Sequence, residues 1–309
     1  KSYRLISLLP SLGKFFERII LDRLQSWESN LIRPEQFGFR QEHSTVHQLL
    51  RVKSCIEQNK ADQNSQLLDV AKAFDSVWHG GLLHKLVDFG LPVYSAKIIS
   101  SYLKHRTFRV SLDSVLSYPN PVPAGVPQEC LLAPLLYILY TMDIPPLPCD
   151  GMLFLFADDT AITVKGRSDR TKKLQRCLHI FLRFAADCRI KINPSKTQVI
   201  VFIYRFKKTL TPPLIRGLIV DGTTVPWSPS VKYWGLHVES VLERGHLLLK
   251  CLYPLISRRS RLTQSNKLTV YKHIILPVAT YAAPVWSTCA EAQLCRLQIV
   301  LNKLLLMIT

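Results

Sequence analysis

Residues 154–162 read FLFADDTAI, in which two adjacent aspartates interrupt an apolar run of β-forming residues. Aspartate favours turns because its side chain hydrogen-bonds to nearby backbone, so Asp158 and Asp159 could simply close a β-hairpin. Two carboxylates between strands too apolar to solvate them are also suited to a divalent cation, whose preferred ligands are oxygen atoms. A third carboxylate elsewhere in the chain would decide between these two interpretations.

That third carboxylate is Asp69, within the stretch LLDVAKAFDSVWH at 67–79. The short apolar segment 66–70 predicts a strand beside the 154–162 hairpin, with Asp69 near its end. Two Mg²⁺ ions about 4 Å apart, held by carboxylates of neighbouring strands, can move a nucleotidyl group by activating a 3′-hydroxyl and stabilising pyrophosphate. The pattern therefore predicts a metal site, in which Asp69 and Asp158 bridge the ions and Asp159 either tunes the local electric field or contacts one ion more weakly.

The composition is that of a globular protein, with 309 residues, 48% of them hydrophobic and 20% charged. The 40 Lys and Arg residues outnumber the 22 Asp and Glu residues, which gives a net charge of +18. Such an excess points to a polyanionic partner, and we favour nucleic acid over an anionic membrane surface. The longest nearly uncharged apolar stretch, 131–142, is shorter than the roughly 20 residues of a spanning helix, so no membrane association is expected.

The eight cysteines include no C-x-x-C pair, which predicts buried free thiols in the reducing interior of a cell. The chain starts at Lys1 without a signal-type apolar segment, so we expect a fragment of a longer protein with no targeting signal in view.

Apolar periodicity and turn residues predict a mixture of helices and strands. Helices are expected at 14–27, 42–57, 79–90, 130–142 and 170–188, and strands at 66–70, 106–112 and 197–204. The Asp-Gly pair within 218–225 predicts another hairpin. After Glu239 the pattern is helical, which indicates a lobe boundary near residue 240.

Eight stretches then follow one another along nearly the whole chain: ISLLPSLGKFFERIILDRL, EQFGFRQEHST, LLDVAKAFDSVWHGGLLHKL, AGVPQECLLAPLLYILY, LFLFADDTAI, IKINPSKTQVIVF, VKYWGLHV and LYPLISRRSRLTQSNKLTVYKHIILPVATYAAPVW. In this order they resemble the reverse transcriptase domain of a non-LTR, LINE-like retrotransposon of the Jockey type. The tetrapeptide FADD alone could occur in any hairpin, whereas the joint order of the eight stretches is highly specific.

The resemblance implies an α+β fold, a right-hand polymerase with fingers, an antiparallel-sheet palm and a helical thumb. Residues 1–239 would form fingers and palm, the fingers coming from the N-terminal helices and part of 90–125. Residues 240–309 would form a thumb-like region with a shortened junction. The implied activity is that of an RNA-directed DNA polymerase.

Metal binding is implied for the triad Asp69, Asp158 and Asp159, with the backbone carbonyl of Val70 completing the shell of an ion. The cofactor would be a pair of Mg²⁺ ions, with Mn²⁺ as an alternative.

Four further residues acquire roles in nucleotide handling from the resemblance. Arg40 would hold the triphosphate, although it could equally be an ordinary surface arginine. Phe74 would stack under the incoming sugar and exclude a 2′-hydroxyl, and its competing interpretation is a core phenylalanine. Gln128 would contact the nucleotide. Lys196 would protonate pyrophosphate, although most lysines of so basic a chain serve only the surface.

The partners implied are an RNA template, a DNA primer and deoxynucleoside triphosphates, with an endonuclease domain elsewhere in the full-length element. We expect an intracellular location, in the nucleus and cytoplasm.

The chain departs from the family pattern at one critical position, because Glu129 stands where the loop normally reads P-Q-G. The added side chain would crowd the nucleotide loop, and its charge would repel a triphosphate. An alternative function is therefore an impaired reverse transcriptase remnant that only binds nucleic acid. A metal-dependent phosphohydrolase using the same aspartates is a third hypothesis, and it leaves Arg40 and Gln128 unexplained.

Overall fold

The computed structural model describes residues 6–28, 31–58, 63–68, 73–112, 115–148, 151–165, 169–202, 217–225, 260, 262–281, 283 and 291–308. Two compact units emerge from the contacts between backbone segments, the first made of residues 1–44 and 59–229 and the second of residues 45–58 and 230–309. The two predicted site residues Asp69 and Val70 lie outside the described residues.

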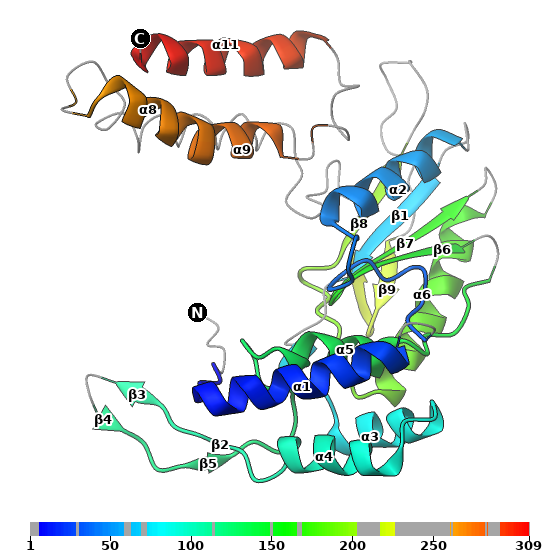
Figure 1. The fold of residues 1–309 in the computed structure, drawn as a ribbon. Coiled ribbons are helices and arrows are strands. Elements are labelled where there is room, and N and C mark those ends of the chain that lie inside the picture. Colours follow the sequence, from blue (N-terminus) through cyan, green and yellow to red (C-terminus); the bar gives the residue numbers. More distant parts are fainter. Residues whose placement is uncertain are drawn as a thin grey trace. The chain divides into compact units, whose positions relative to one another are not determined.

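Four antiparallel strands of the described chain form the central sheet of the first unit, in the order β6-β7-β1-β8 (Figure 1). Their bounds are β6 Gly151–Phe156, β7 Asp159–Lys165, β1 Gln63–Leu68 and β8 Gln198–Phe202. The predicted hairpin is confirmed, and so is the expectation that a strand before Asp69 lies beside it, because Leu68 of β1 pairs with Thr160 of β7. Strand β1 begins at Gln63, three residues before the predicted start.

Helix α6 (Arg170–Asp187) packs against β1, β6 and β7 of this sheet, and helix α5 (Leu132–Thr141) belongs to the same buried core. Nine of the ten residues of α5 are buried, as expected for a helix that is apolar on all sides. Helix α6 is amphipathic, and its buried stripe includes Leu174, Leu178 and Phe181. Both helices were predicted from the sequence, and together they supply the core beneath the aspartate hairpin.

Three more helices, α1 (Ser11–Glu28), α3 (His79–Asp88) and α4 (Val93–Leu103), complete the same core. Helix α3 is terminated by Gly90, as the sequence predicted. Gly90 has a φ of 85°, a left-handed conformation that glycine adopts readily because it has no Cβ. A single-turn 3₁₀ helix, η1 (Ala73–Asp75), precedes α3 and carries Phe74.

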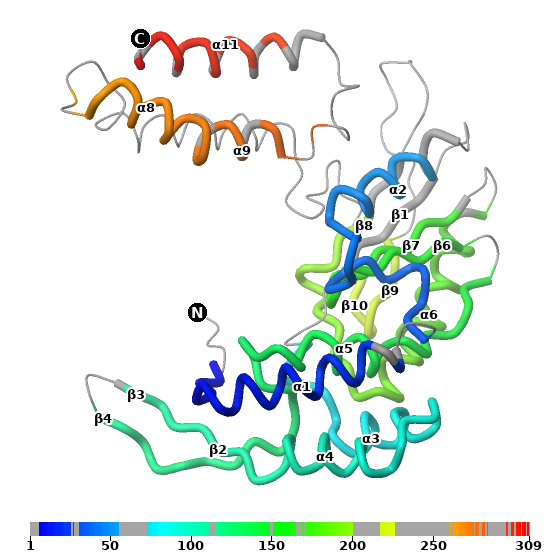
Figure 2. The backbone as a smooth tube through the Cα atoms, viewed as in Figure 1, coloured from blue at the N-terminus to red at the C-terminus, as the bar shows by residue number. Residues whose placement is uncertain are grey.

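The prediction of one continuous strand at 106–112 is wrong. The structure has two short strands there, β2 (Thr107–Phe108) and β3 (Ser111–Leu112). These pair with β5 (Asn120–Pro121) and β4 (Val115–Leu116) in a narrow arm that leads away from α4 (Figure 2). The side chains of Val115 and Leu116 are exposed, so no buried face holds the arm in one continuous ladder.

The Asp-Gly hairpin is confirmed as β9 (Leu218–Val220) and β10 (Thr223–Val225). Asp221 and Gly222 have φ values of 47° and 74°, as a type I′ turn requires. The side chain of Gln175 on α6 donates to the carbonyl of Ile219 over 3.0 Å and accepts from its N–H over 2.9 Å, which ties the hairpin to α6.

The second unit is helical where it is described. It contains α2 (Thr45–Gln58), α8 (Gln264–Val270), the π-helical segment η2 (Tyr271–Ile275), α9 (Leu276–Thr280) and α11 (Glu291–Ile308). The Tyr281 hydroxyl donates to Thr45 Oγ1 over 2.9 Å. The helical character expected after residue 239 is confirmed for these segments, while the division into fingers, palm and thumb stays a prediction.

None of the helices that the structure describes is long and apolar enough to cross a bilayer. Of the described cysteines, four are buried as expected, whereas Cys295 on α11 is exposed.

Candidate active site

The two adjacent aspartates lie at the end of the β6–β7 hairpin, where Ala157 and Asp158 form a two-residue turn. Asp158 is half-buried and Asp159, the first residue of β7, is exposed. Ala157 has a φ of 57°, in the left-handed region that costs a residue with a Cβ about 1 kcal/mol. The turn that carries the carboxylates is therefore strained and must be held by its surroundings.

Gln36 supplies that support from a segment 121 residues away in sequence. Its side chain is buried, and Oε1 accepts hydrogen bonds from the N–H groups of Ala157 at 3.0 Å and Gly38 at 2.9 Å. Its Nε2 donates to the carbonyl of Ala157 at 3.5 Å. Both backbone groups of the strained residue are thus bonded to one side chain. The sequence gives no sign of this contact, since EQFGFR reads only as a glycine-bearing turn.

The segment around Gln36 is also held against β6 through its backbone. Phe37 N–H donates to the carbonyl of Leu155 over 2.9 Å, and Leu155 N–H donates to the carbonyl of Glu35 over 3.1 Å. The approach is so close that a Cβ on Gly38 would lie 2.2 Å from the nitrogen of Ala157. Only glycine fits this position without displacing the aspartate turn.

Arg40, the predicted triphosphate ligand, belongs to the same segment. Its half-buried guanidinium donates through Nη1 to the carbonyls of Arg33 and Gln36, each over 3.2 Å. One nitrogen of the guanidinium therefore anchors the residue to its own loop.

Phe74 is connected to the aspartate turn through Tyr137 of α5. The two rings are tilted against each other with centroids 5.0 Å apart, and the ring of Phe39 lies edge-on to Phe74 at 6.4 Å. Burial raises the pKa of the Tyr137 hydroxyl, and the negative charge of Asp158 raises this pKa further. Phe74 is half-buried and packs against the core, so its role in sugar selection stays a prediction beside the core interpretation.

The predicted nucleotide loop lies against the η1 segment. Val126 N–H donates to the carbonyl of Phe74 over 2.8 Å, and the side chain of Gln128 donates from Nε2 to Asp75 Oδ1 over 2.5 Å. Next to Gln128, the exposed Glu129 has a φ of 64°. The position that is glycine in the family pattern thus has the backbone conformation that favours glycine.

A buried carboxylate that the sequence analysis did not single out supports the other end of this loop. Glu17 of α1 is 1% exposed, accepts the N–H of Leu131 over 3.2 Å and accepts the hydroxyl of Tyr102. Burial raises the pKa of Tyr102, and the hydrogen bond to Glu17 adds to the increase. Leu131, the residue directly before α5, is therefore fixed to α1.

Lys196 is exposed in the turn before β8, where its N–H donates to the carbonyl of Asn193 over 3.3 Å. Strand β1 lies between β7 and β8, and its Leu67 pairs with Ala161 on one side and Gln198 on the other. Asp159 lies two positions before Ala161, and Lys196 lies two positions before Gln198. These two predicted site residues therefore belong to the same end of the sheet.

No three histidine, cysteine, aspartate or glutamate side chains converge as a metal site within the part of the chain that the structure describes. The third predicted ligand, Asp69, lies outside that part. The chemistry of the donors nevertheless fits Mg²⁺, because Asp158 and Asp159 present carboxylate oxygens from one turn with apolar strands behind it.

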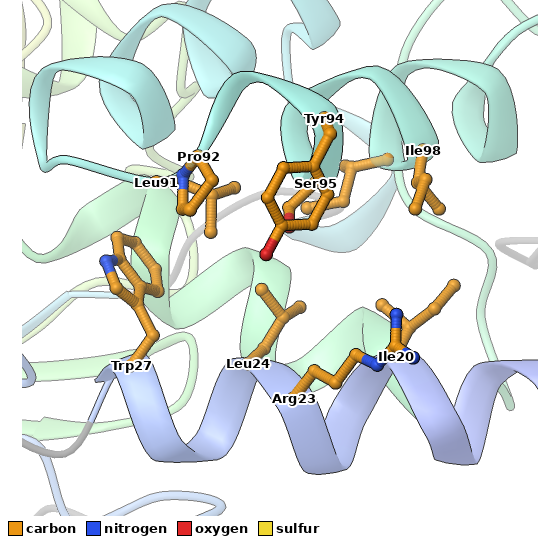
Figure 3. Close-up of a pocket in the computed structure, with 10 residues that line it drawn as sticks. Ile20, Arg23, Leu24, Trp27, Leu91, Pro92, Tyr94, Ser95 and Ile98 are labelled. Atoms are coloured by element: carbon orange, nitrogen blue, oxygen red, sulfur yellow. The ribbon is translucent and has the colours of Figure 1, made fainter.

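A separate groove of about 410 Å³ lies between α1 and α4 (Figure 3). Its lining consists mainly of apolar side chains, among them Leu24, Trp27 and Ile98, together with Arg23 and Tyr94. None of the predicted site residues lines it, so the candidate active site is the aspartate turn and not this groove.

Residues 1–238 match the family described as reverse transcriptase (RNA-dependent DNA polymerase), and the chain belongs to this family. It is 38% identical to the probable RNA-directed DNA polymerase from transposon X-element of Drosophila melanogaster, over 100% of this chain and 36% of that protein. It is 34% identical to the RNA-directed DNA polymerase from mobile element jockey of the same species, over 98% of this chain and 35% of that protein. The resemblance to Jockey-type retrotransposons is thereby confirmed.

Reverse transcriptases generally use divalent metal ions. Among solved structures, telomerase from Candida tropicalis in complex with a telomeric RNA fragment is similar over 96% of this chain and 55% of that chain, with 12% identity and a TM-score of 0.46.

Proposed function

We propose that this domain adds deoxynucleotides to a DNA primer on an RNA template, using two Mg²⁺ ions or, as an alternative, Mn²⁺. The observation that carries the proposal is the end of the central sheet, where Asp158 of the two-residue turn and Asp159 of β7 present adjacent carboxylates and Gln36 joins this turn to the Arg40 segment. In this arrangement residues 1–239 act as fingers and palm of a right-hand polymerase, and residues 240–309 act as the thumb.

Strand register supports the inclusion of Asp69 in the metal site. Leu67 pairs with Ala161 and Gln198, and Asp69, Asp159 and Lys196 each lie two positions further toward the same end of the sheet. If both antiparallel registers continued by two residues, Asp69 would stand opposite Asp159 on one side and Lys196 on the other. The carbonyl of Val70 would complete the shell of one ion.

The residues of this chain hold the reactants. Arg40 binds the triphosphate, Phe74 lies under the sugar and selects deoxynucleotides, and Gln128 contacts the nucleotide. Lys196 donates a proton to the departing pyrophosphate. The divalent ions, when bound, activate the primer 3′-hydroxyl and stabilise the charge of the leaving group.

The net charge of +18 supports a nucleic-acid duplex as the macromolecular partner. The chain spans 36% of the X-element protein that it matches, so the full-length element has room for an endonuclease domain. We place the activity inside the cell, in the nucleus and cytoplasm.

Primer extension on an RNA template with Mg²⁺ tests the proposal. Asp158→Ala should lower the extension rate at least about 100-fold, because it removes a ligand of the charge-stabilising ions. Asp88→Ala, at an exposed position of α3, is the matched control and should leave the rate unchanged. Extension that survives Asp158→Ala would contradict the assignment of the site.

The second candidate function, nucleic-acid binding without synthesis, is favoured by one observation, the strained Glu129 in the nucleotide loop. It predicts salt-sensitive binding of a primer–template duplex together with no extension at any concentration of metal or nucleotide.

A further inference from the structure

Gln36 contacts both halves of the candidate site. Its side chain bonds to Ala157 in the aspartate turn, while its backbone carbonyl accepts Nη1 of Arg40 over 3.2 Å. A single residue thus joins the predicted triphosphate ligand to the turn that carries Asp158.

The chemistry of the contact requires a glutamine. The Ala157 and Gly38 N–H groups need an acceptor, and the carbonyl of Ala157 needs a donor. A primary amide provides both, whereas a carboxylate provides only the acceptor. The position is 3% exposed, so water cannot replace a lost partner.

The backbone strain at Ala157 makes its hydrogen bonds to Gln36 relevant to catalysis. Ala157 holds a left-handed φ of 57° in a turn of two residues, and such a conformation persists only when its neighbours fix it. If the amide of Gln36 were absent, the turn could relax, and the carboxylate of Asp158 would move with it.

We infer that Gln36 is a positioning residue that holds the Asp158 carboxylate at a set distance from Arg40, so that the triphosphate and the catalytic carboxylates are aligned before the nucleotide arrives. The inference rests on the proposed function.

The test compares Gln36→Met, which keeps the length of the side chain and removes both hydrogen-bonding groups, with the parent. We expect the rate constant for primer extension to fall about 100-fold, with unchanged affinity for the primer–template duplex. Amide hydrogen exchange in the segment 154–160 should accelerate. The Mn²⁺ concentration at which half of the protein has bound the ion should rise several-fold. Gln36→Glu should also be slow, because it retains the acceptor but loses the donor.

Gln175→Met is the matched control. Gln175 likewise bonds to both backbone groups of one residue, Ile219, but it does so at the β9–β10 hairpin. This variant should lose less stability, because water can replace its exposed hydrogen bonds, and it should retain the extension rate and the Mn²⁺ affinity.

The outcomes separate the two claims. If the parent extends no primer, the proposed function fails. The role of Gln36 is then decided by comparing the Mn²⁺ affinity of Gln36→Met with that of the parent, because this measurement needs no catalysis. Gln36→Met with parental exchange and parental Mn²⁺ affinity would overturn the inference, and so would equal losses of rate in Gln36→Met and Gln175→Met.

Discussion

The side-chain amide of Gln128 donates a hydrogen bond to the carboxylate of Asp75 over 2.5 Å, across 53 residues of sequence. An ionised carboxylate can only accept, so the NH₂ group of Gln128 must face Asp75. The amide oxygen is thereby turned away from Asp75. Asp75 thus fixes which end of the Gln128 amide is offered to a nucleotide.

A double-mutant cycle measures this relationship. Asp75→Ala and Gln128→Ala should each raise the KM for the incoming nucleotide about ten-fold, in line with the loss of one charge-assisted hydrogen bond. The double variant should be no worse than Gln128→Ala alone, because Asp75 acts through Gln128. Effects that multiply in the double variant would show that the two residues act independently.

Glu129→Gly should relieve a conformational strain as well as remove a charge. Glycine adopts the observed φ of 64° without a steric penalty, so the free energy of unfolding should rise by about 1 kcal/mol. Loss of the carboxylate beside the nucleotide loop should raise primer extension about ten-fold, equivalent to about 1.4 kcal/mol in the transition state, with RNA binding nearly unchanged.

Asp221→Gly provides the comparison for this variant, because Asp221 is an exposed carboxylate with a φ of 47° in the β9–β10 turn. It should gain stability without gaining activity. A parent that already extends primers at the rate of an ordinary polymerase would show that Glu129 does no harm.

Gly38→Ala should disrupt the aspartate turn. The new Cβ would lie 2.2 Å from the nitrogen of Ala157, so either the Gln36 segment or the turn must shift. We expect a loss of about 2 kcal/mol in unfolding free energy and a large loss of primer extension. Gly13→Ala on α1, where the nearest atom to the new Cβ is 3.4 Å away, should be tolerated. Denaturant unfolding and extension assays on both variants would check this.

High pH should destabilise the first unit through Tyr140 of α5. Burial raises the pKa of Tyr140 to about 12, above its ordinary value near 10. Between these values the unfolded chain loses its phenolic proton first, so the free energy of unfolding should fall as the pH rises. Urea midpoints measured across this window should fall less steeply in Tyr140→Phe, even though this variant loses the hydrogen bond to the Cys188 carbonyl. An equal slope in the variant would assign the effect to other groups.

Sequence reasoning succeeded where local pattern determines structure. The apolar run of α5, the stripe of α6 and the Asp-Gly turn each specify their element, and the short apolar segment before Asp69 predicted the strand that lies beside the aspartate hairpin. The arm at 106–122 was mispredicted because its residues have β propensity but no buried face, and propensity alone does not make a continuous strand.

The contacts of Gln36 and Glu17 could not be predicted from the sequence. Each side chain reaches more than 100 residues along the chain to bond to a backbone N–H, of Ala157 and Leu131 respectively. A backbone N–H is present at every residue except proline, so the identity of the partner leaves no trace in the sequence. Only the burial of two polar side chains in the folded unit reveals their importance.

The aspartate hairpin is constrained in length as well as in composition. Its turn contains two residues, and side chains alternate along β7, so one codon gained or lost between Gly151 and Lys165 would move every later side chain of the strand to the opposite face. Ile162 and Val164 would then leave the core positions that they fill. The exposed arm between β2 and β5 has no such alternation to preserve. Among related sequences, in-frame insertions and deletions should therefore be found in the arm, whereas a single one in the hairpin should disrupt the turn that carries Asp158.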